Sequence, residues 1–218
     1  MNEGSFIILK DKMKKLSKKE KYKQEKKQKI IDAALKVFAV KGFNSAKISD
    51  IAKEAKIADG TIYIYFKKKD DIIISLFQDK MGAFNKLLKE KIEEKKNAID
   101  KLKTFISIHL KILSEKRELA EIFTIELRQS SKFMESYQNT ELKDYAKLLM
   151  SIIDEGKKNK LFKDDIHTSI IWQFIFGILD QTVLTWVRKE NSTEKGLQKM
   201  IKFVLLFILD SILIKEKK

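Results

Sequence analysis

The sequence contains no cysteine and no proline, and only seven of its 218 residues are glycine. The absence of cysteine excludes a disulfide framework and any thiolate metal site, and it is typical of proteins in the reducing cytoplasm. Without proline and with little glycine, few residues would interrupt a helix. The longest apolar run, residues 203–209, is far shorter than the roughly 20 residues that cross a bilayer, and the N-terminal residues show no secretory signal pattern. We therefore expect a cytoplasmic, helix-rich protein without a membrane anchor.

Positive charge is concentrated near the N-terminus. The net charge is +15, and residues 1–70 hold 19 basic residues against 9 acidic ones, whereas residues 71–218 hold 27 against 22. This asymmetry predicts a polyanionic partner at the N-terminal end. The eleven lysines between Lys10 and Lys29 would also suit an anionic membrane surface, but the segment has no matching apolar face. Nucleic acid is therefore the expected partner, and a membrane is not.

Candidate catalytic groups are sparse. The two histidines, His109 and His167, lie far apart in the sequence, and no metal-ligand spacing, phosphate-binding loop or nucleophile–base pair is present. Catalysis needs such groups gathered in one cleft. We therefore expect neither an enzyme nor a bound metal or cofactor. His109 is expected to be a hydrogen-bonded core residue, and His167 is expected to be exposed.

Apolar residues recur at helical spacing along almost the whole chain, and no strand-like alternation persists. The pattern predicts an all-α protein of about nine helices. We expect a basic mobile arm over residues 1–23, a helix-turn-helix domain over 24–68 and a larger helical domain over 69–218. Asp164 and Ser192 are expected to be helix N-caps. In the larger domain the expected helices cover residues 69–95, 99–114, 117–131, 134–158, 164–190 and 193–214.

Residues 30–71 are predicted to form a helix-turn-helix, a motif whose last helix enters the major groove of DNA. Gly42 is expected to close the first helix in the left-handed conformation. In the last helix, Gly60 lets the backbone approach DNA closely, and Thr61 offers a hydroxyl and a methyl group to base edges. The free amides at this helix N-terminus also favour a phosphate. The side chains expected to form the core beneath the helix are Phe38, Ile48, Ile51, Ile62 and Phe66.

This segment resembles the DNA-binding domain of TetR-family transcriptional regulators. The resemblance is carried by Gly42-Phe43, Ile48, Ile51-Ala52, Ala55, Gly60-Thr61, Tyr63, Tyr65-Phe66-Lys67, Lys69 and Asp70-Asp71. It implies a dimer that binds double-stranded operator DNA, with the helical remainder serving dimerisation and ligand binding. The DNA-binding residues that the resemblance and the side-chain chemistry imply are Lys47, Ser49, Asp59, Gly60, Thr61, Tyr63, Tyr65, Lys67 and Lys69.

Some positions depart from the pattern of that family. Lys56 occupies a turn position that usually carries glycine, and a left-handed lysine there would cost about 1–2 kcal/mol. Ala58 replaces the usual serine cap of the recognition helix, so we expect Asp59 to act as the cap. These departures put individual contacts in question but leave the fold expectation unchanged.

Other features of this surface leave alternatives open. Lys47 replaces a threonine at the start of the second helix, which offers a charge to a phosphate and leaves helix capping to Ser45 or Asn44. Tyr63 and Tyr65 are expected to project outward, where a phenol suits a phosphate or sugar contact. For either tyrosine, covering the core of the small domain is the alternative.

A second resemblance covers nearly the whole chain. It is carried by residues 57–63, 72–77, 80–82, 126–130, 176–180 and 185–187. These positions look like the fatty-acid-degradation repressor branch of the TetR family, which implies repression of β-oxidation genes relieved by long-chain acyl-CoA. The last two expected helices are the most apolar, and we expect them to form a homodimer as well as part of the core.

Aromatic residues supply a candidate effector tunnel, in which each methylene of an acyl chain is worth about 0.8 kcal/mol. Arg128 lies among apolar neighbours and needs a partner, either Glu126, Asp180 or a ligand's phosphate or thioester; an internal salt bridge without a ligand role is the alternative. A multidrug-efflux regulator that binds a hydrophobic cation is the competing interpretation, because Glu121, Glu126 and Asp180 would suit such a ligand. The residues expected to line the effector site are Phe84, Phe105, Phe123, Leu127, Arg128, Phe174, Phe176, Asp180 and Trp186.

Overall fold

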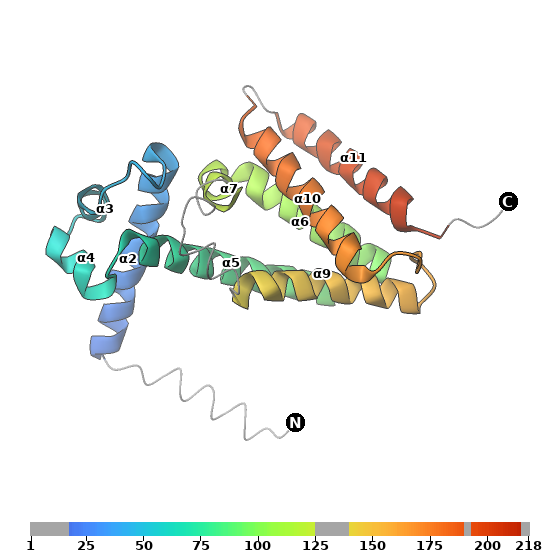
Figure 1. The fold of residues 1–218 in the computed structure, drawn as a ribbon, viewed down its shortest axis with the longest axis horizontal. Helices are drawn as coiled ribbons and strands as arrows, with labels where there is room; N and C mark the ends of the chain where they lie inside the picture. Colours follow the sequence, from blue (N-terminus) through green and yellow to red (C-terminus); the bar gives the residue numbers. More distant parts are fainter. Residues whose placement is uncertain (1–17, 125–139, 190–192, 215–218) are drawn as a thin grey trace, which may run out of the picture.

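The computed structural model describes residues 18–124, 140–189 and 193–214 (Figure 1). Within these ranges the chain forms nine α-helices and no strand, apart from an isolated β-bridge between Phe162 and Leu213. The all-α prediction is therefore confirmed. In chain order the helices are α2 (Lys18–Lys41), α3 (Ile48–Ala55), α4 (Asp59–Tyr65), α5 (Lys69–Glu93), α6 (Ala98–Glu115), α7 (Arg117–Thr124), α9 (Thr140–Lys158), α10 (Thr168–Val187) and α11 (Glu194–Ile212).

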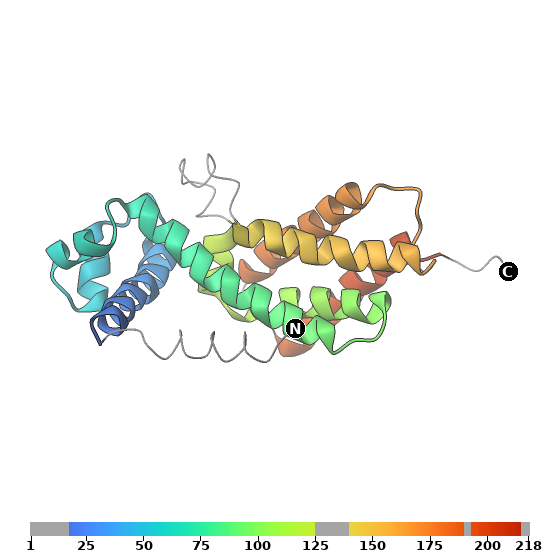
Figure 2. The same ribbon diagram turned by 90° about the horizontal axis from the view of Figure 1, so that it is seen from below.

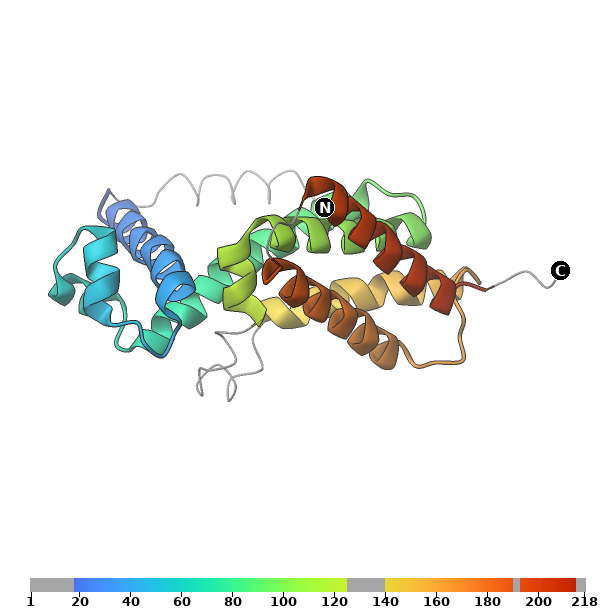
Figure 3. The same cartoon turned by 90° about the horizontal axis from the view of Figure 1, so that it is seen from above.

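The molecule is elongated, with α2, α3 and α4 gathered at one end and the bundle of later helices at the other (Figures 1 and 2). The long helix α5 joins the two parts, because it packs on α2 near its start and on α6 and α9 further along. Helix α10 packs on α6, α7 and α9, and α11 packs on α6. Both α10 and α11 face the viewer in Figure 3. Helix α7 contacts α2 and α10, so it also connects the two parts.

One helix boundary differs from the sequence prediction. Helix α2 begins at Lys18, inside the segment expected to be a separate basic arm, because the lysine-rich stretch continues the helix without a breaking residue. The expected helices over 117–131 and 134–158 are represented by α7 and α9. Residues 125–139 between them, like 1–17, lie outside the described residues.

The predicted N-caps of α10 and α11 are wrong by a few residues. His167 caps α10, since its Nδ1 accepts a backbone N–H two residues later at 3.3 Å. Asp164 instead lies 3.6 Å from the ammonium of Lys157. Thr193 caps α11, since its hydroxyl accepts the N–H three residues later at 3.1 Å. The prediction had placed this cap at Ser192, one residue earlier.

The predicted core of the helix-turn-helix is largely confirmed. Phe38, Ile51 and Ile62 are fully buried and Phe66 is 4% exposed, whereas Ile48 is only half-buried against them. Gly42 ends α2 with φ of 73°, the left-handed conformation expected for it. The apolar spacing of three and four residues therefore fixes which faces of α2, α3 and α4 meet.

Among the described residues, α10 alone has the length and apolar composition that could cross a membrane, a property that core helices of water-soluble proteins share. The uninterrupted apolar runs of the sequence do not indicate this helix, because isolated polar residues such as Gln173 and Asp180 divide its apolar stretch. A third of the relevant window is buried inside the protein, where α10 packs on three other helices.

Candidate DNA-binding surface and effector site

Helix α4 presents one apolar face inward and one open face outward. Ile62 is fully buried, whereas Tyr63 and Ile64 on the opposite face are 58% and 72% exposed. Ala58 is the N-cap residue, and no side chain accepts a hydrogen bond there. The expectation that Asp59 caps α4 is therefore wrong, because Asp59 is already the first helical residue. Its carboxylate instead adds negative charge to the first turn, where the helix dipole favours it.

The turn between α3 and α4 contains the left-handed lysine that the sequence suggested. Lys56 has φ of 53° and ψ of 50°. The N–H of Ile57 donates to the carbonyl of Ala52 at 3.0 Å, so the end of α3 closes as a Schellman-type turn around Lys56. This closure offsets part of the cost of the left-handed lysine and holds α3 and α4 at the angle of a helix-turn-helix.

The start of α3 is capped differently from the prediction. Lys47 is the N-cap residue, and its backbone N–H donates to the carboxylate of Asp50 at 3.0 Å, so neither Ser45 nor Asn44 has this role. The Lys41 ammonium lies 2.6 Å from the same carboxylate. The bonds from Lys41 and from the Lys47 backbone hold the pKa of Asp50 below its ordinary value. The Lys47 side chain itself is exposed, as is Ser49 two residues further on.

The residues around the α4 N-terminus leave room for a close approach of DNA. Gly60 is exposed, and no atom lies within 4 Å of the position that a Cβ would take. Thr61 is half-buried. Tyr65 is half-buried and packs against the core, in contrast to the exposed Tyr63. Core packing, the alternative given for each tyrosine, therefore applies to Tyr65 and not to Tyr63.

Lys69 and Lys67 occupy different environments. The Lys69 ammonium donates to the backbone carbonyls of Phe43, Asn44 and Ala46 at 2.5, 3.0 and 2.9 Å, and it lies 4.7 Å from the centre of the Phe43 ring. Lys67 is exposed. Lys69 thus ties the loop between α2 and α3 to the start of α5, and its phosphate contact stays a prediction.

A second polar connection joins α2 to α5. The Lys80 ammonium lies 2.8 Å from the carboxylate of Asp32 and 3.0 Å from that of Asp79. Gln28 donates to the same two carboxylates at 3.2 and 3.0 Å. Burial alone would lower the pKa of Lys80, but the two carboxylate bonds outweigh it and raise that pKa. Helix α2, which together with α3 and α4 forms the DNA-reading unit, is therefore bonded to α5 about three turns from the start of α5.

In the larger domain, an aromatic cluster from four helices surrounds Tyr145 of α9. Its ring centre lies 5.0 Å from that of Phe105, 5.8 Å from His109, 6.0 Å from Phe176 and 6.3 Å from Phe84. These residues come from α5, α6, α9 and α10. The cluster therefore lies where the long connecting helix meets the rest of the bundle.

Two polar groups lie at the centre of this cluster. The Tyr145 hydroxyl and His109 Nδ1 are 2.8 Å apart, and both residues are buried. Burial lowers the pKa of His109 to about 3. Burial, and then the charge of Asp180, hold the pKa of Tyr145 well above its ordinary value. Both groups are therefore neutral at neutral pH.

The sequence predicted that His109 is a hydrogen-bonded core residue, and this holds for one of its two ring nitrogens. It is a buried helix residue, as expected, but its Nε2 has no hydrogen-bond partner among the described residues. His167 is exposed, as expected. Tyr145 was not anticipated at all. In the sequence, the place of His109 four residues after Phe105 indicated that both face the core. For Tyr145 the only indication was its place on the apolar face of α9.

The structure brings together only part of the predicted effector set. Phe84, Phe105 and Phe176 belong to the aromatic cluster, and Asp180 acts electrostatically on Tyr145. Phe123 packs separately, with its ring 5.1 Å from that of Phe77. The remaining predicted residues lie elsewhere: Leu127 and Arg128, with Glu126, are outside the described residues, Phe174 is 64% exposed, and Trp186 lines a different groove.

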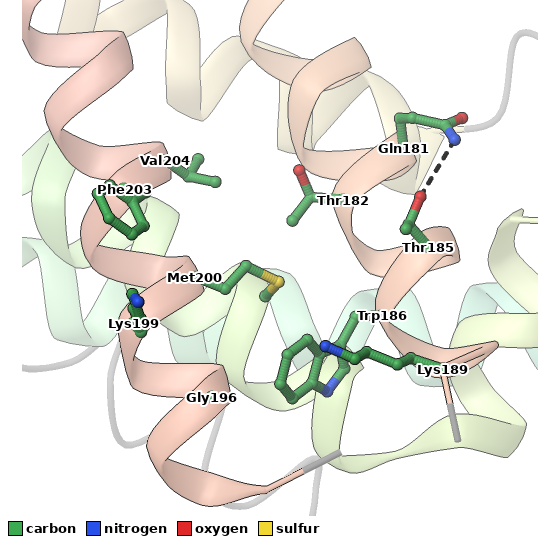
Figure 4. Close-up of a pocket in the computed structure, with 10 residues that line it drawn as sticks. All are labelled: Gln181, Thr182, Thr185, Trp186, Lys189, Gly196, Lys199, Met200, Phe203 and Val204. Carbon is green, nitrogen blue, oxygen red and sulfur yellow. Dashed lines mark hydrogen bonds between the residues drawn. The ribbon is translucent and has the colours of Figure 1, made fainter. Parts of the chain in front are cut away.

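That groove lies between the C-terminal half of α10 and the N-terminal half of α11 (Figure 4). Its volume is about 580 Å³. Trp186 and Met200 point toward one another across it, and the ammonium groups of Lys189 and Lys199 lie near aromatic rings at its edge (Figure 4). The same two helices also carry exposed large apolar side chains, namely Ile170, Phe174, Phe203, Leu206 and Phe207.

Comparison with known proteins agrees with this architecture. Residues 30–76 match the family model of the bacterial regulatory proteins of the tetR family. Residues 77–211 match the model of the C-terminal region of YsiA-like proteins of the same family. The chain belongs to the TetR family. The helix-turn-helix prediction is thereby confirmed, and this TetR-family chain is a transcriptional regulator.

Relatives of this TetR-family chain include characterised regulators. The fatty acid metabolism regulator protein of Bacillus subtilis is 43% identical over 171 residues, which cover 78% of this chain and 88% of the relative. The solved structure of FadR from B. subtilis in complex with stearoyl-CoA is 39% identical with a TM-score of 0.77, over 84% of this chain and 97% of that one. The solved structure of the fatty acid degradation regulator FadR from Bacillus halodurans is 40% identical with a TM-score of 0.76, over 84% of this chain and 97% of that one.

Lys67, which precedes α5, and Lys69, its first residue, should respond differently to the same substitution. Lys69→Met removes three bonds from an ammonium to backbone carbonyls, so we expect a loss of about 1–3 kcal/mol of stability, seen as a lower melting temperature. Lys67→Met should leave the melting temperature unchanged and weaken binding to operator and random DNA alike, with the salt slope of log K reduced by about one. Melting curves and salt-dependent fluorescence anisotropy distinguish them. A Lys69→Met variant with unchanged melting but a reduced salt slope would place that ammonium on DNA instead.

Proposed function

We propose that this TetR-family protein is a cytoplasmic repressor of fatty-acid-degradation genes, which binds operator DNA as a homodimer and is released by long-chain acyl-CoA. The observation that carries the proposal is the similarity over most of both chains to FadR in complex with stearoyl-CoA. The proposal includes action by binding and not by catalysis, because the relatives on which it rests are regulators.

The DNA-binding part of the proposal rests on the exposed surface of α3 and α4. Gly60 leaves the recognition helix open to close approach, with Thr61 beside it for a base edge and Tyr63 for the backbone. Lys47, Ser49 and Lys67 are exposed around them, where cations and a hydroxyl suit phosphates. Asp59, Tyr65 and Lys69 complete the proposed set, and Tyr65 and Lys69 also have contacts within the protein.

The dimer part rests on the exposed apolar surface of α10 and α11. Phe174, Phe203 and Phe207 are each more than half exposed there, together with Leu206. Large contiguous apolar patches on a protein surface mark interaction sites. Paired recognition helices would then read two half-sites about one helical turn apart, which a single copy cannot do.

The effector part rests on the aromatic cluster around Tyr145. An acyl chain there would contact Phe84, and Phe84 belongs to α5, whose N-terminal end is bonded to the DNA-reading unit. Each methylene buried contributes about 0.8 kcal/mol, so a long chain has enough free energy to displace α5. A coupling of about 1–3 kcal/mol lowers operator affinity roughly 5- to 150-fold. We include Phe105, Phe176 and Asp180 in this site, and Phe123, Leu127, Arg128 and Trp186 stay as candidates for its outer part.

Native mass spectrometry of the purified protein, combined with operator anisotropy at fixed salt, tests the proposal. We expect a dimer that carries acyl-CoA or takes up stearoyl-CoA, and whose operator affinity falls by the factor given above. Free coenzyme A serves as the control without an acyl chain, and a hydrophobic quaternary ammonium cation serves as the probe for an efflux regulator. Stearoyl-CoA binding with unchanged operator affinity would contradict the release mechanism. Binding of the cation but not of stearoyl-CoA would contradict the effector class.

A further inference from the structure

His109 Nε2 is a polar atom inside the aromatic cluster around Tyr145, and none of the described residues offers it a hydrogen bond. It is buried, it has no hydrogen-bond partner among the described residues, and the imidazole lies beside the rings of Phe84 and Tyr145, with centres 5.9 and 5.8 Å away. Buried polar groups in native proteins nearly always have a partner, and a specific exception calls for an explanation such as a ligand. The position of this atom in the proposed effector site supplies that explanation.

The hydrogen bond to Tyr145 determines what this nitrogen offers. Among the described residues the Tyr145 hydroxyl has one hydrogen-bond partner, His109 Nδ1 at 2.8 Å, so the phenol proton is satisfied only when it is donated to that nitrogen. A neutral imidazole carries one proton, so when Nδ1 accepts, Nε2 carries the N–H. His109 therefore presents an uncharged donor into the aromatic cluster. The matching ligand group is an uncharged acceptor.

We propose that the N–H of His109 Nε2 donates a hydrogen bond to the thioester carbonyl oxygen of the bound acyl-CoA, and that Tyr145 is the positioning residue that holds the imidazole in this tautomer. The inference rests on the function proposed above. A hydrophobic cation would be repelled at this point by the partial positive charge of the N–H hydrogen. A free fatty acid would bring a full charge close to Asp180, which already acts on Tyr145. The thioester brings an acceptor without a charge, and the long uncharged pantetheine arm lets the nucleotide stay outside.

The test compares two ligands that differ only at the carbonyl. Stearoyl-CoA has the thioester, and S-octadecyl-CoA is the thioether in which a methylene replaces the carbonyl. We expect the natural protein to bind the thioester about tenfold more tightly, the size of one well-placed hydrogen bond to an otherwise unsatisfied donor. Calorimetry gives both dissociation constants, and the infrared stretch of a ¹³C-labelled thioester carbonyl should move to lower frequency on binding.

The variants separate a ligand contact from a purely structural role. His109→Phe/Tyr145→Phe leaves neither polar group unpaired, so it is expected to fold, and it should bind the two ligands equally and abolish the infrared shift. Tyr145→Phe alone should reduce the preference for the thioester, because the imidazole proton can then lie on either ring nitrogen of His109. His167→Asn, which keeps a capping side chain on α10, is the matched control and should change neither readout.

The outcomes distinguish this inference from the proposed function. A natural protein that binds both ligands equally, or a preference that survives in the double variant, overturns the role of His109 and leaves the acyl-CoA effector intact. A natural protein that binds neither ligand overturns both. A tenfold preference that disappears with His109 supports both.

Discussion

Replacing Gly60 with glutamate is expected to weaken operator binding by about a hundredfold or more while the protein stays folded. Gly60 is exposed at the start of α4, and nothing lies within 4 Å of where its Cβ would be, so the new side chain meets no protein atom. On DNA the same side chain would hold the helix away from the groove and place a carboxylate beside phosphates. Juxtaposed like charges cost several kcal/mol, and about 3 kcal/mol corresponds to a hundredfold. Anisotropy with labelled operator measures the loss.

Two alanine variants control for helix stability and for size. Gly60→Ala and Gly82→Ala each replace a helical glycine whose Cβ would meet open space, so each should stabilise its helix by up to about 1 kcal/mol. Gly82→Ala should leave the operator affinity of the ligand-free protein unchanged, because Gly82 lies in α5, beyond the helix-turn-helix. Gly60→Ala should fall between the natural protein and the glutamate variant. Full operator binding by Gly60→Glu would mean that this face of α4 does not approach DNA.

The largest expected effect on stability is that of Gly156→Ala at the end of α9. A Cβ on Gly156 would lie 2.0 Å and 2.2 Å from two ring carbons of Phe162. The ring is fully buried and cannot move aside, and the carbonyl of Gly156 accepts the N–H groups of Leu161 and Phe162. Overpacking a well-filled core typically costs about 1–3 kcal/mol, and a clash this close should cost about 3 kcal/mol or more. Differential scanning calorimetry should therefore show a clearly lower melting temperature.

Replacing the Phe162 ring with a smaller side chain should restore part of the stability that Gly156→Ala removes. Phe162→Leu alone is destabilising, because it leaves space in the core. In the double variant Gly156→Ala/Phe162→Leu the methyl group enters that space, so the double variant should be more stable than the sum of the two single effects predicts. Strictly additive effects would show that the backbone at the end of α9 shifts to absorb the clash, and not the Phe162 ring.

The sequence predicted the elements whose residues act through local spacing. The apolar spacing located α2, α3 and α4 and the inward faces of Ile62 and Phe66, and the left-handed Gly42 and Lys56 were anticipated from turn chemistry. Helix caps were predicted less well. A cap depends on which of several neighbouring polar residues has the right backbone angles, so His167 and Thr193 took roles assigned to residues close by.

Contacts between residues far apart in the sequence could not be predicted. His109 and Tyr145 are 36 positions apart, and neither helix by itself shows that two polar atoms meet in the core. The same holds for Trp186. Its apolar surroundings in the sequence fit a tunnel and a groove equally well, and only the packing of α10 and α11 on α6 decides between them.

The three carbonyl bonds of Lys69, together with the Lys80 bonds to α2, determine where α5 can bend. They make the helix-turn-helix and the first three turns of α5 one stiff arm, so bending within α5 has to occur beyond Lys80, where Gly82 is the first residue without a side chain. From there to Lys69 the helix is roughly 20 Å long. A tilt of about 10° at that point would carry the start of α5 sideways by roughly 3.5 Å, comparable to one base-pair step of 3.4 Å. A rotation too small to disturb the core could thus move each recognition helix out of register with its half-site.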